Sequence, residues 1–485
     1  MILKNNFKLF ITILSISIII LSYIFLKKYE DFNINYQLYL IGSLIILMMP
    51  IIYYLYSDIE KNFLPIFYLV TSYFFISYFM YYLLNWGEGL DDNGKRLYVN
   101  NANTSEVLYS LKIFFLGILM FNIGYFITKF FFKKNNFFSN YLKISNINEL
   151  VLISLIVNLF TIIFFYLIKI DIYLNQFNQL KIPLIYLSIA LSFFVILKTT
   201  SFFKYIFLIP LIIFFLIELI GGSYVFPFKM LFFMYFLYFS FTKKFLLSPI
   251  LIIFIMSFVI HSSKHEFRKL IWDTQSIDGK TVTFNKNLTQ KYYSFIWAYK
   301  KDIKRFKNYN TDSKYRHLYN RNFSRLFHSP KSLIIVTKNT PNKIPYWNGQ
   351  SYKIILTKII PRIIWKDKPS DRLGNEFGRR YNILGKADYS TSWNMPVLNE
   401  FYANFGIKGV MIGMFIIGLL LRLLLNFFVI EKNNGYSILV GSATLYPFFY
   451  FESHLSMISG ALIQQFIFLF IVIFLCKKTL LYLKI

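Results

Sequence analysis

Long apolar stretches separated by short polar connections make up most of the chain. A helix needs about 20 mostly apolar residues to cross the hydrocarbon core of a bilayer. The pattern predicts an all-α polytopic membrane protein with about 12 transmembrane helices, and the shortness of several stretches allows about 11 to 13. The predicted helices cover residues 9–26, 37–56, 63–84, 107–128, 150–168, 182–197, 205–220, 225–241, 245–261, 406–430, 436–452 and 455–475. We take the first as a span because no small-residue cleavage site follows its apolar run.

One polar segment, residues 262–405, interrupts this pattern before the last three predicted helices. We therefore expect three parts: an N-terminal transmembrane module of about nine helices (1–261), this long loop, and a C-terminal transmembrane module of about three helices (406–485). Lys and Arg are more frequent in the short connections that lie on the same side of the membrane as the N-terminus than in those on the opposite side. Such residues favour the cytoplasmic face. Both termini are expected in the cytoplasm and the long loop on the extracytoplasmic side.

The composition narrows the class further. The chain is 56% hydrophobic and 15% charged, whereas soluble globular proteins are about 25% charged. Disordered chains have low hydrophobicity, so that class is excluded too. The single cysteine, Cys476, excludes a disulfide scaffold and a cysteine-based metal site. The net charge of +29 is unevenly distributed, because the long loop has 27 Lys and Arg against 10 Asp and Glu and so contains +17 of it.

Arginine is concentrated in the long loop, although the chain as a whole prefers lysine. Nine of the 11 arginines lie there: Arg268, Arg305, Arg316, Arg321, Arg325, Arg362, Arg372, Arg379 and Arg380. The planar guanidinium binds phosphate through two parallel hydrogen bonds and keeps its charge when partly buried. The loop is therefore predicted to bind an anionic lipid-linked ligand such as a pyrophosphate. The alternative is a solvated basic loop on anionic lipid headgroups, and no nucleic-acid-binding motif is present.

The start of the loop carries the first candidate site residues. If the preceding helix continues, His261, His265 and Arg268 fall on one face, with Glu266 beside them. This face would present a base and a phosphate-binding group, although interfacial capping explains the same residues. Further along, Arg325 lies one turn from a second arginine and suits either one phosphate or a solvated helix face.

Aromatic residues in the loop have two competing interpretations. The apolar stripe from Tyr292 to Trp297 predicts local packing rather than a sugar-binding platform. Trp347 and Asn348 precede Gly349, which predicts a turn with an exposed aromatic side chain that holds a sugar or anchors at the membrane interface. Residues 352–365 are too short to span the bilayer, and they predict an interfacial helix that carries Arg362 at the headgroup level.

The densest polar stretch is 371–406, which enters the tenth predicted helix directly. Pro396 is expected to open a helix, and ordered loops beside a bilayer with mixed arginine and carboxylate are good active-site candidates. The candidate residues here are Glu376, Arg379, Arg380, Glu400, Tyr402 and Asn404.

Four further polar residues lie in or between the predicted spans. Glu218 is a functional candidate or the partner of an outer basic residue. Arg422 is expected to snorkel towards the cytoplasm. His454 and Glu452 lie on the short outer turn between the last two predicted helices, where they would complete an outer pocket.

Several motifs together carry a resemblance. They are His265-Glu-Phe-Arg268, Pro345-Tyr-Trp-Asn-Gly349, Pro361-Arg-x-x-Trp365, Gly378-Arg-Arg-Tyr381, Thr391-Ser392, Pro396 and Glu400-Phe-Tyr-x-Asn-Phe-Gly406. With the single large loop before the last few spans, this pattern resembles the bacterial oligosaccharide repeat-unit polymerases, the Wzy-type O-antigen polymerases. The resemblance covers roughly residues 260–430, and the first 260 residues match only as a generic membrane module.

The resemblance implies an architecture like that of C-type glycosyltransferases and O-antigen ligases, in the bacterial inner membrane. It implies an enzyme that moves a growing glycan from undecaprenyl pyrophosphate onto the next lipid-linked repeat unit, without a metal or other cofactor. A chain-length regulator and a flippase are candidate protein partners.

The same resemblance implies roles for the candidate residues. Leaving-group stabilisation falls to Arg268, Arg362, Arg379 and Arg380, with Arg325, Tyr402 and Asn404 as further pyrophosphate ligands. The general base is expected to be His265 or Glu400, and Glu266 and Glu376 are the next candidates. Trp347 and Asn348 are the candidate sugar ligands.

Two other functions stay open. An O-antigen ligase shares the architecture but delivers the glycan to a different acceptor. A lipid-linked oligosaccharide flippase or other transporter would show internal pseudo-symmetry, which the sequence does not display. A C-type glycosyltransferase that uses a lipid monophosphate sugar is disfavoured, because the first outer loop covers only residues 27–36.

Overall fold

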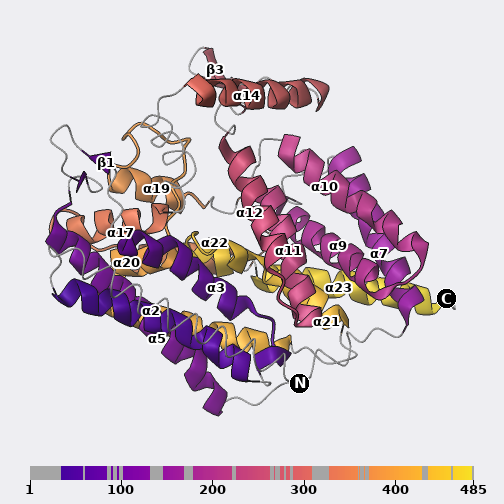
Figure 1. Cartoon of the computed structure of the whole chain (residues 1–485), viewed down its shortest axis with the longest axis horizontal. Helices are drawn as coiled ribbons and strands as arrows, with labels where there is room; N and C mark the ends of the chain where they lie inside the picture. Colours follow the sequence, from indigo (N-terminus) through magenta and orange to yellow (C-terminus); the bar gives the residue numbers. More distant parts are fainter. Residues whose placement is uncertain are drawn as a thin grey trace. The chain divides into compact units, whose positions relative to one another are not determined.

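The computed structural model is helical throughout, apart from two short hairpins (Figure 1). It describes residues 34–57, 60–84, 89–90, 96–97, 102–131, 146–168, 178–220, 225–262, 267, 274–277, 280–283, 288–308, 327–358, 360, 365, 367, 371–428, 435–459 and 462–482. The first predicted span, 9–26, lies outside these residues.

Eight helices of the described chain are long and apolar enough to cross a bilayer, which supports a membrane protein. They are Ile34–Tyr54, Ile66–Leu83, Thr104–Thr128, Ile147–Leu167, Leu180–Lys198, Phe202–Leu219, Val397–Phe427 and Leu455–Leu480. Two further predicted spans coincide with shorter apolar helices, Phe226–Thr242 and Leu247–Ser257.

The predicted span 436–452 is interrupted. Helix α21 (Gly435–Thr444) has ten residues, and a 3-10 helix (Tyr446–Tyr450) with Pro447 in its first turn follows it. Proline has no N–H to donate and clashes with the preceding turn, so an α-helix does not continue through it. Ten helical residues span about 15 Å, which is half of a bilayer core.

The chain folds into two compact units, each discontinuous in sequence. The first unit comprises residues 1–144 and 327–472, and the second comprises 145–326 and 473–485. The expected three parts are consecutive segments of the sequence, whereas the two observed units are defined by which segments pack together. The first unit therefore takes up residues 327–405, the second half of the predicted loop.

In the first unit, α2 (Ile34–Tyr56), α3 (Ile66–Phe74), α5 (Thr104–Phe131) and α20 (Val397–Phe427) form the main bundle (Figure 1). Helix α3 continues through one π-helical turn, Phe75–Phe79, into α4 (Met80–Leu83). Shorter helices complete the unit: α17 (His328–Asn339), α18 (Lys353–Lys358), α19 (Leu373–Arg380), α22 (Leu455–Ser459) and most of α23 (Leu462–Tyr482). Two strands, β1 (Gly89–Leu90) and β2 (Arg96–Leu97), pair antiparallel.

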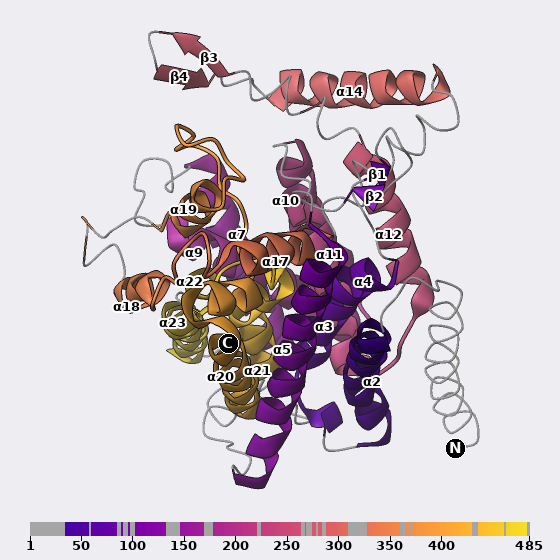
Figure 2. The ribbon, with the colours of Figure 1, turned by 90° about the vertical axis from the view of Figure 1, so that its left-hand side faces the viewer.

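Helices α5 and α20 lie in direct backbone contact (Figure 2). A Cβ atom on Gly124 would lie 2.1 Å from the Phe415 carbonyl oxygen, and one on Gly418 would lie 2.1 Å from that of Phe121. Small residues allow such close approach, which favours helix association in lipid, where apolar burial alone gives little. The glycines thus allow α20 to pack directly against α5.

The second unit is a bundle of α7 (Ile147–Ile162), α9 (Asn178–Lys198), α10 (Leu208–Ile220), α11 (Val225–Thr242) and α12 (Leu247–Ser262). Asn158 on α7 donates to Ser192 on α9 over 2.8 Å and accepts a hydrogen bond from Ser188. The unit also contains a hairpin of β3 (Thr274–Ile277) and β4 (Lys280–Thr283) and the amphipathic helix α14 (Leu288–Asn308).

Candidate functional site

Helix α20 is broken near its start, and the break organises the candidate site. Gly406 has φ +60° and ψ −146°, a conformation that is essentially restricted to glycine. Its missing side chain also leaves room for the Tyr346 hydroxyl, which would lie 2.6 Å from a Cβ atom at this position. The first two turns of α20 therefore end in backbone carbonyls that lack their usual helical partners.

The loop that contains Trp347 and Asn348 supplies these partners. The Trp347 N–H donates to the Ala403 carbonyl over 3.0 Å, and the Asn348 N–H donates to the Asn404 carbonyl over 3.3 Å. Asn348 and Gly349 both have positive φ, +50° and +82°, so the predicted turn is confirmed. Two motifs some 50 residues apart in the sequence thus interlock through backbone hydrogen bonds.

Two buried side chains extend this connection. The Asn404 amide oxygen accepts from the Gly349 N–H over 2.9 Å, and its amide nitrogen donates to the Ser351 hydroxyl over 2.9 Å. The Glu400 carboxylate accepts from Ser351 Oγ and from the Leu455 N–H, both over 2.7 Å. Glu400 is fully enclosed, so its carboxylate joins α20, the 346–351 loop and α22 and does not face solvent.

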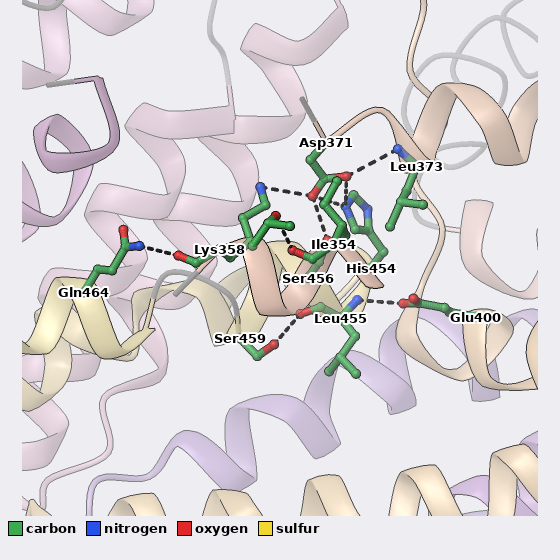
Figure 3. Close-up of polar contacts among 11 residues, drawn as sticks. Ile354, Lys358, Asp371, Leu373, Glu400, His454, Leu455, Ser456, Ser459 and Gln464 are labelled. Atoms are coloured by element: carbon green, nitrogen blue, oxygen red, sulfur yellow. Dashed lines mark hydrogen bonds and ion pairs between the residues drawn. The ribbon is translucent and has the colours of Figure 1, made fainter. Parts of the chain in front are cut away.

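A second polar cluster centres on Asp371 (Figure 3). Its carboxylate lies 3.1 Å from Lys358 Nζ, 3.0 Å from His454 Nε2 and 2.6 Å from Ser456 Oγ. Burial opposes ionisation, but the hydrogen bonds and charge of His454, the hydroxyl of Ser456 and the charge of Lys358 outweigh it. Together they hold the pKa of Asp371 well below its usual range. The cluster holds α18, the residues before α19 and the start of α22 together.

The two clusters share one short segment of chain. His454 bonds Asp371 through its side chain, while the next residue, Leu455, bonds Glu400 through its backbone N–H (Figure 3). The start of α22 is therefore held from both sides, which gives His454 a defined position between the broken helix and α18.

The short helix α19 presents two arginines above this scaffold. Arg379 donates from Nε to Asn375 over 2.9 Å, and its guanidinium lies 4.1 Å from the centre of the Tyr389 ring. Arg380 donates to the Pro345 carbonyl over 2.7 Å and lies 5.3 Å from the centre of the Trp347 ring. Both side chains are half-buried. A guanidinium has five N–H donors, and these hydrogen bonds use only some of them.

The loop after α19 is held by a network of its own. Asn375 donates to the carbonyls of Asp388 and Thr391 over 2.8 and 2.6 Å. Hydrogen bonds from Thr391 and Ser390 hold the pKa of the exposed Asp388 carboxyl at about 2. The prediction of an ordered loop between α19 and α20 is thereby confirmed.

Arg422 is buried in an ion pair, whereas snorkelling would place its guanidinium among solvated headgroups. Its Nη1 atom lies 2.8 Å from both carboxylate oxygens of Glu60, inside the first unit. The Tyr125 hydroxyl completes the contact, with 3.1 Å to Glu60 and 2.9 Å to Arg422. Both charged side chains are almost completely buried. Glu60 follows the second predicted span, so the ion pair joins the connection before α3 to α20.

The other predicted site residues divide into those placed and those outside the described chain. Trp347 is 2% exposed and lies beneath Arg380, so the prediction of an exposed aromatic side chain is wrong; the exposed residue of the turn is Asn348. Tyr402 is buried against Tyr109, and Glu376 is exposed on α19. His265, Glu266, Arg268, Arg325 and Arg362 lie outside the described residues.

Sequence reasoning did not single out Asp371, Ser351 or Glu60. Asp371 and Ser351 lie at the edges of stretches whose other residues are the candidates. Their neighbours in the sequence show no motif that marks them as site residues. Glu60 carried a usable signal, because a lone acid between two apolar stretches pairs with an equally isolated intramembrane arginine. Among the described residues, no group of three or more His, Cys, Asp or Glu side chains is suited to a metal ion.

Comparison of the chain with protein-family models, with curated proteins and with solved structures gives no significant match.

Proposed function

We propose that this protein polymerises lipid-linked oligosaccharide repeat units at the extracytoplasmic face of a bacterial inner membrane. An acceptor sugar hydroxyl attacks the anomeric carbon of the growing glycan, the bond to undecaprenyl pyrophosphate breaks, and the lipid pyrophosphate leaves. The reaction class comes from the sequence resemblance, and the geometry of the first unit supplies the residues for it.

One observation carries the proposal. Three separate segments of the resemblance, namely Pro345–Gly349, Gly378–Tyr381 and Glu400–Gly406, lie together in one hydrogen-bonded assembly. Arg380 bonds the first segment, and the first segment bonds the third through the break in α20. Packing against lipid alone does not require hydrogen bonds between these three segments, so the contacts indicate a shared site.

Arg379 and Arg380 are the proposed ligands of the leaving pyrophosphate. Each is oriented by protein hydrogen bonding and by an aromatic ring, and other N–H donors of its guanidinium remain for phosphate oxygens. Donors that are held in place before the reaction stabilise developing negative charge without further reorganisation. Arginine also keeps its charge next to apolar rings.

For the proton of the attacking hydroxyl we assign His454 in its neutral form. Proton uptake then gives the charged imidazolium that pairs with Asp371. A carboxylate that accepts from one ring nitrogen fixes the imidazole tautomer and leaves the other nitrogen to take a proton, which is the arrangement of many general bases. Asp371 occupies that orienting position. Glu400, by contrast, already accepts a protein hydrogen bond on each carboxylate oxygen.

The test uses purified full-length protein in liposomes, supplied with a synthetic undecaprenyl-pyrophosphate-linked repeat unit. The wild type is expected to release products of many repeats on a gel. Arg380→Ala and Arg379→Ala should each slow lengthening by about 10²-fold, the usual effect of removing one oriented donor. Arg372→Ala is the matched control, because Arg372 is exposed at the start of the same helix.

Other outcomes separate the alternatives. Transfer of a preformed chain to a second acceptor without lengthening would identify a ligase. Movement of the lipid-linked substrate between leaflets without lengthening would identify a transporter. Equal activity of the wild type, Arg379→Ala and Arg380→Ala would reject the proposed site, even if lengthening occurs.

A further inference from the structure

Helix α14 exposes aromatic side chains on one face, contrary to the prediction that they pack locally. Tyr293 is 67% exposed and Trp297 is 49% exposed. Lys300 and Lys304 follow on the same face at helical spacing, and both are exposed. We call these four residues, Tyr293, Trp297, Lys300 and Lys304, the outer stripe.

The opposite face of α14 performs the packing. Ala298 and Phe295 contact Leu219, near the end of α10, and Phe267, which follows α12. Figure 1 shows α14 lying crosswise near that end of these helices. In a helix of 3.6 residues per turn, positions 295 and 298 lie opposite positions 293, 297, 300 and 304. The outer stripe therefore points away from Leu219 and Phe267, against which the opposite face of α14 packs.

The outer stripe combines aromatic rings with positive charge. Helix α14 contains six Lys and Arg residues and one Asp, a net charge of +5. The Lys301 ammonium lies over one face of the Trp297 ring, 4.5 Å from its centre, so positive charge and aromatic surface are already in contact here. A partner that matches this surface needs apolar faces for the rings and repeated negative charges for the lysines.

We propose that the outer stripe binds an acidic saccharide chain. Sugar rings present C–H faces that stack on tyrosine and tryptophan, and carboxylate or phosphate substituents pair with lysine ammonium groups. This inference rests on the proposed function and deepens it, because it makes the glycan acidic and gives the growing chain a binding surface outside the site of transfer. Anionic lipid fits less well, because the outer stripe faces away from Leu219, the last residue of the apolar helix Phe202–Leu219.

The test measures binding without turnover. Full-length protein in neutral phosphatidylcholine nanodiscs is titrated with alginate oligosaccharides, which are polyuronates, and with neutral dextran oligosaccharides of similar length. We expect alginate to bind more tightly than dextran, and added salt to weaken its binding because exposed ion pairs are screened. Trp297→Ala should weaken alginate binding by about threefold to tenfold, the value of one aromatic contact.

The variants keep the two proposals separate. Lys300→Gln with Lys304→Gln should abolish the preference for alginate, whereas Thr289→Ala, an exposed position at the start of the same helix, should leave it unchanged. Arg380→Ala should stop lengthening but leave alginate binding intact. If the wild type binds alginate but does not lengthen chains, the polymerase proposal is rejected and the saccharide-binding role of the outer stripe is retained.

Three results would overturn the inference. Equal affinity for alginate and dextran removes the acidic class. Unchanged alginate binding in Trp297→Ala and in the double lysine variant removes the outer stripe. Binding to vesicles that contain phosphatidylglycerol, lost in those same variants and accompanied by no saccharide binding, would show that the surface binds lipid.

Discussion

At the residue scale, the polar side chains inside the first unit hold segments together. Asn404 and Glu400 each bridge elements that the sequence keeps far apart. Glu60 and Arg422 join the start of α3 to α20 in the same way. Removing one member of such a pair lowers the stability of the fold by more than the loss of one hydrogen bond, because the other member stays buried without its partner.

Arg422→Ala tests this for the buried ion pair. The substitution leaves the Glu60 carboxylate without its cation in an apolar surrounding, and we expect a loss of about 3–5 kcal/mol in the free energy of unfolding. The measurement is denaturation of detergent-purified protein. Lys408→Ala, at an exposed position on the same helix, should have little effect. A double variant, Glu60→Gln with Arg422→Met, should be more stable than Arg422→Ala alone.

Ser351→Ala tests the link between the loop and the broken helix. The Ser351 hydroxyl donates to Glu400 and accepts from Asn404, so its removal leaves two buried groups each short of one partner. The expected loss is about 1–3 kcal/mol in the free energy of unfolding. Ser392→Ala, at an exposed position, is the control, and equal melting temperatures for the two variants would contradict the proposed link.

Asp371 predicts a dependence of stability on pH. Its pKa is lower in the folded protein than the ordinary value of about 3.9 in an unfolded chain. The stabilisation is therefore complete above about pH 4 and is lost as the pH falls towards the folded-state pKa. Thermal melts at decreasing pH should show a steeper loss for the wild type than for Asp371→Asn, with Glu376→Gln as the exposed control. Parallel curves for wild type and Asp371→Asn would contradict the assignment.

The candidate site could be predicted from the sequence only in part. The stretches around Trp347, Arg379 and Glu400 were found because each is a dense group of polar and aromatic residues beside an apolar run. Asp371 and Ser351 were missed because their importance arises from contacts that cross the fold. Trp347 was placed correctly in a turn, but the direction of its ring depends on Arg380, which no local pattern shows.

At the element scale, α20 depends on glycine in two different ways. Gly406 allows the break, and Gly418 allows contact with α5. The sequence predicted a helix from Pro396 and a span from 406, and the structure joins the two into one element, Val397–Phe427. Hydropathy detects the apolar part alone, because the polar first turns are buried by the loop rather than by lipid.

Gly124→Val should disrupt the contact between α5 and α20. Its Cβ atom would lie 2.1 Å from a backbone oxygen of α20, so the two helices must separate. Overpacking of this kind typically destabilises by about 1–3 kcal/mol, and backbone contact makes the upper end the expectation. Gly385→Ala, where a Cβ would meet no atom within 4 Å, is the matched control. Melting temperatures of the two purified variants provide the measurement.

At the scale of the whole molecule, composition and apolar pattern identified a helical membrane protein. They did not predict how the chain divides. The second unit is inserted between two parts of the first, so residues 1–144 pack with 327–472. Contacts such as that between Glu60 and Arg422 join the two parts of the first unit. A hydropathy pattern cannot predict such contacts, because it describes each segment separately.

The expected topology predicts the accessibility of engineered cysteines. In a Cys476→Ser background, Lys386→Cys in the loop after α19 should react with a membrane-impermeant maleimide on intact cells. Lys244→Cys, between α11 and α12, should react only after the membrane is permeabilised. Both positions are exposed, so a difference between them reports the side of the membrane. The reverse pattern would place the termini outside.

The Glu60–Arg422 pair also implies an order of events during biosynthesis. The two residues are separated by 362 positions, which a ribosome translates in roughly 20–70 s. Throughout that interval the Glu60 carboxylate lacks its cation, although Tyr68 and Tyr125, whose hydroxyls bond it in the folded protein, are made early. Glu60 lies between the spans Ile34–Tyr54 and Ile66–Leu83, so water can solvate its carboxylate in the meantime. Its burial waits until α20 has been translated. A nascent chain arrested before residue 422 should be the form most exposed to membrane proteases.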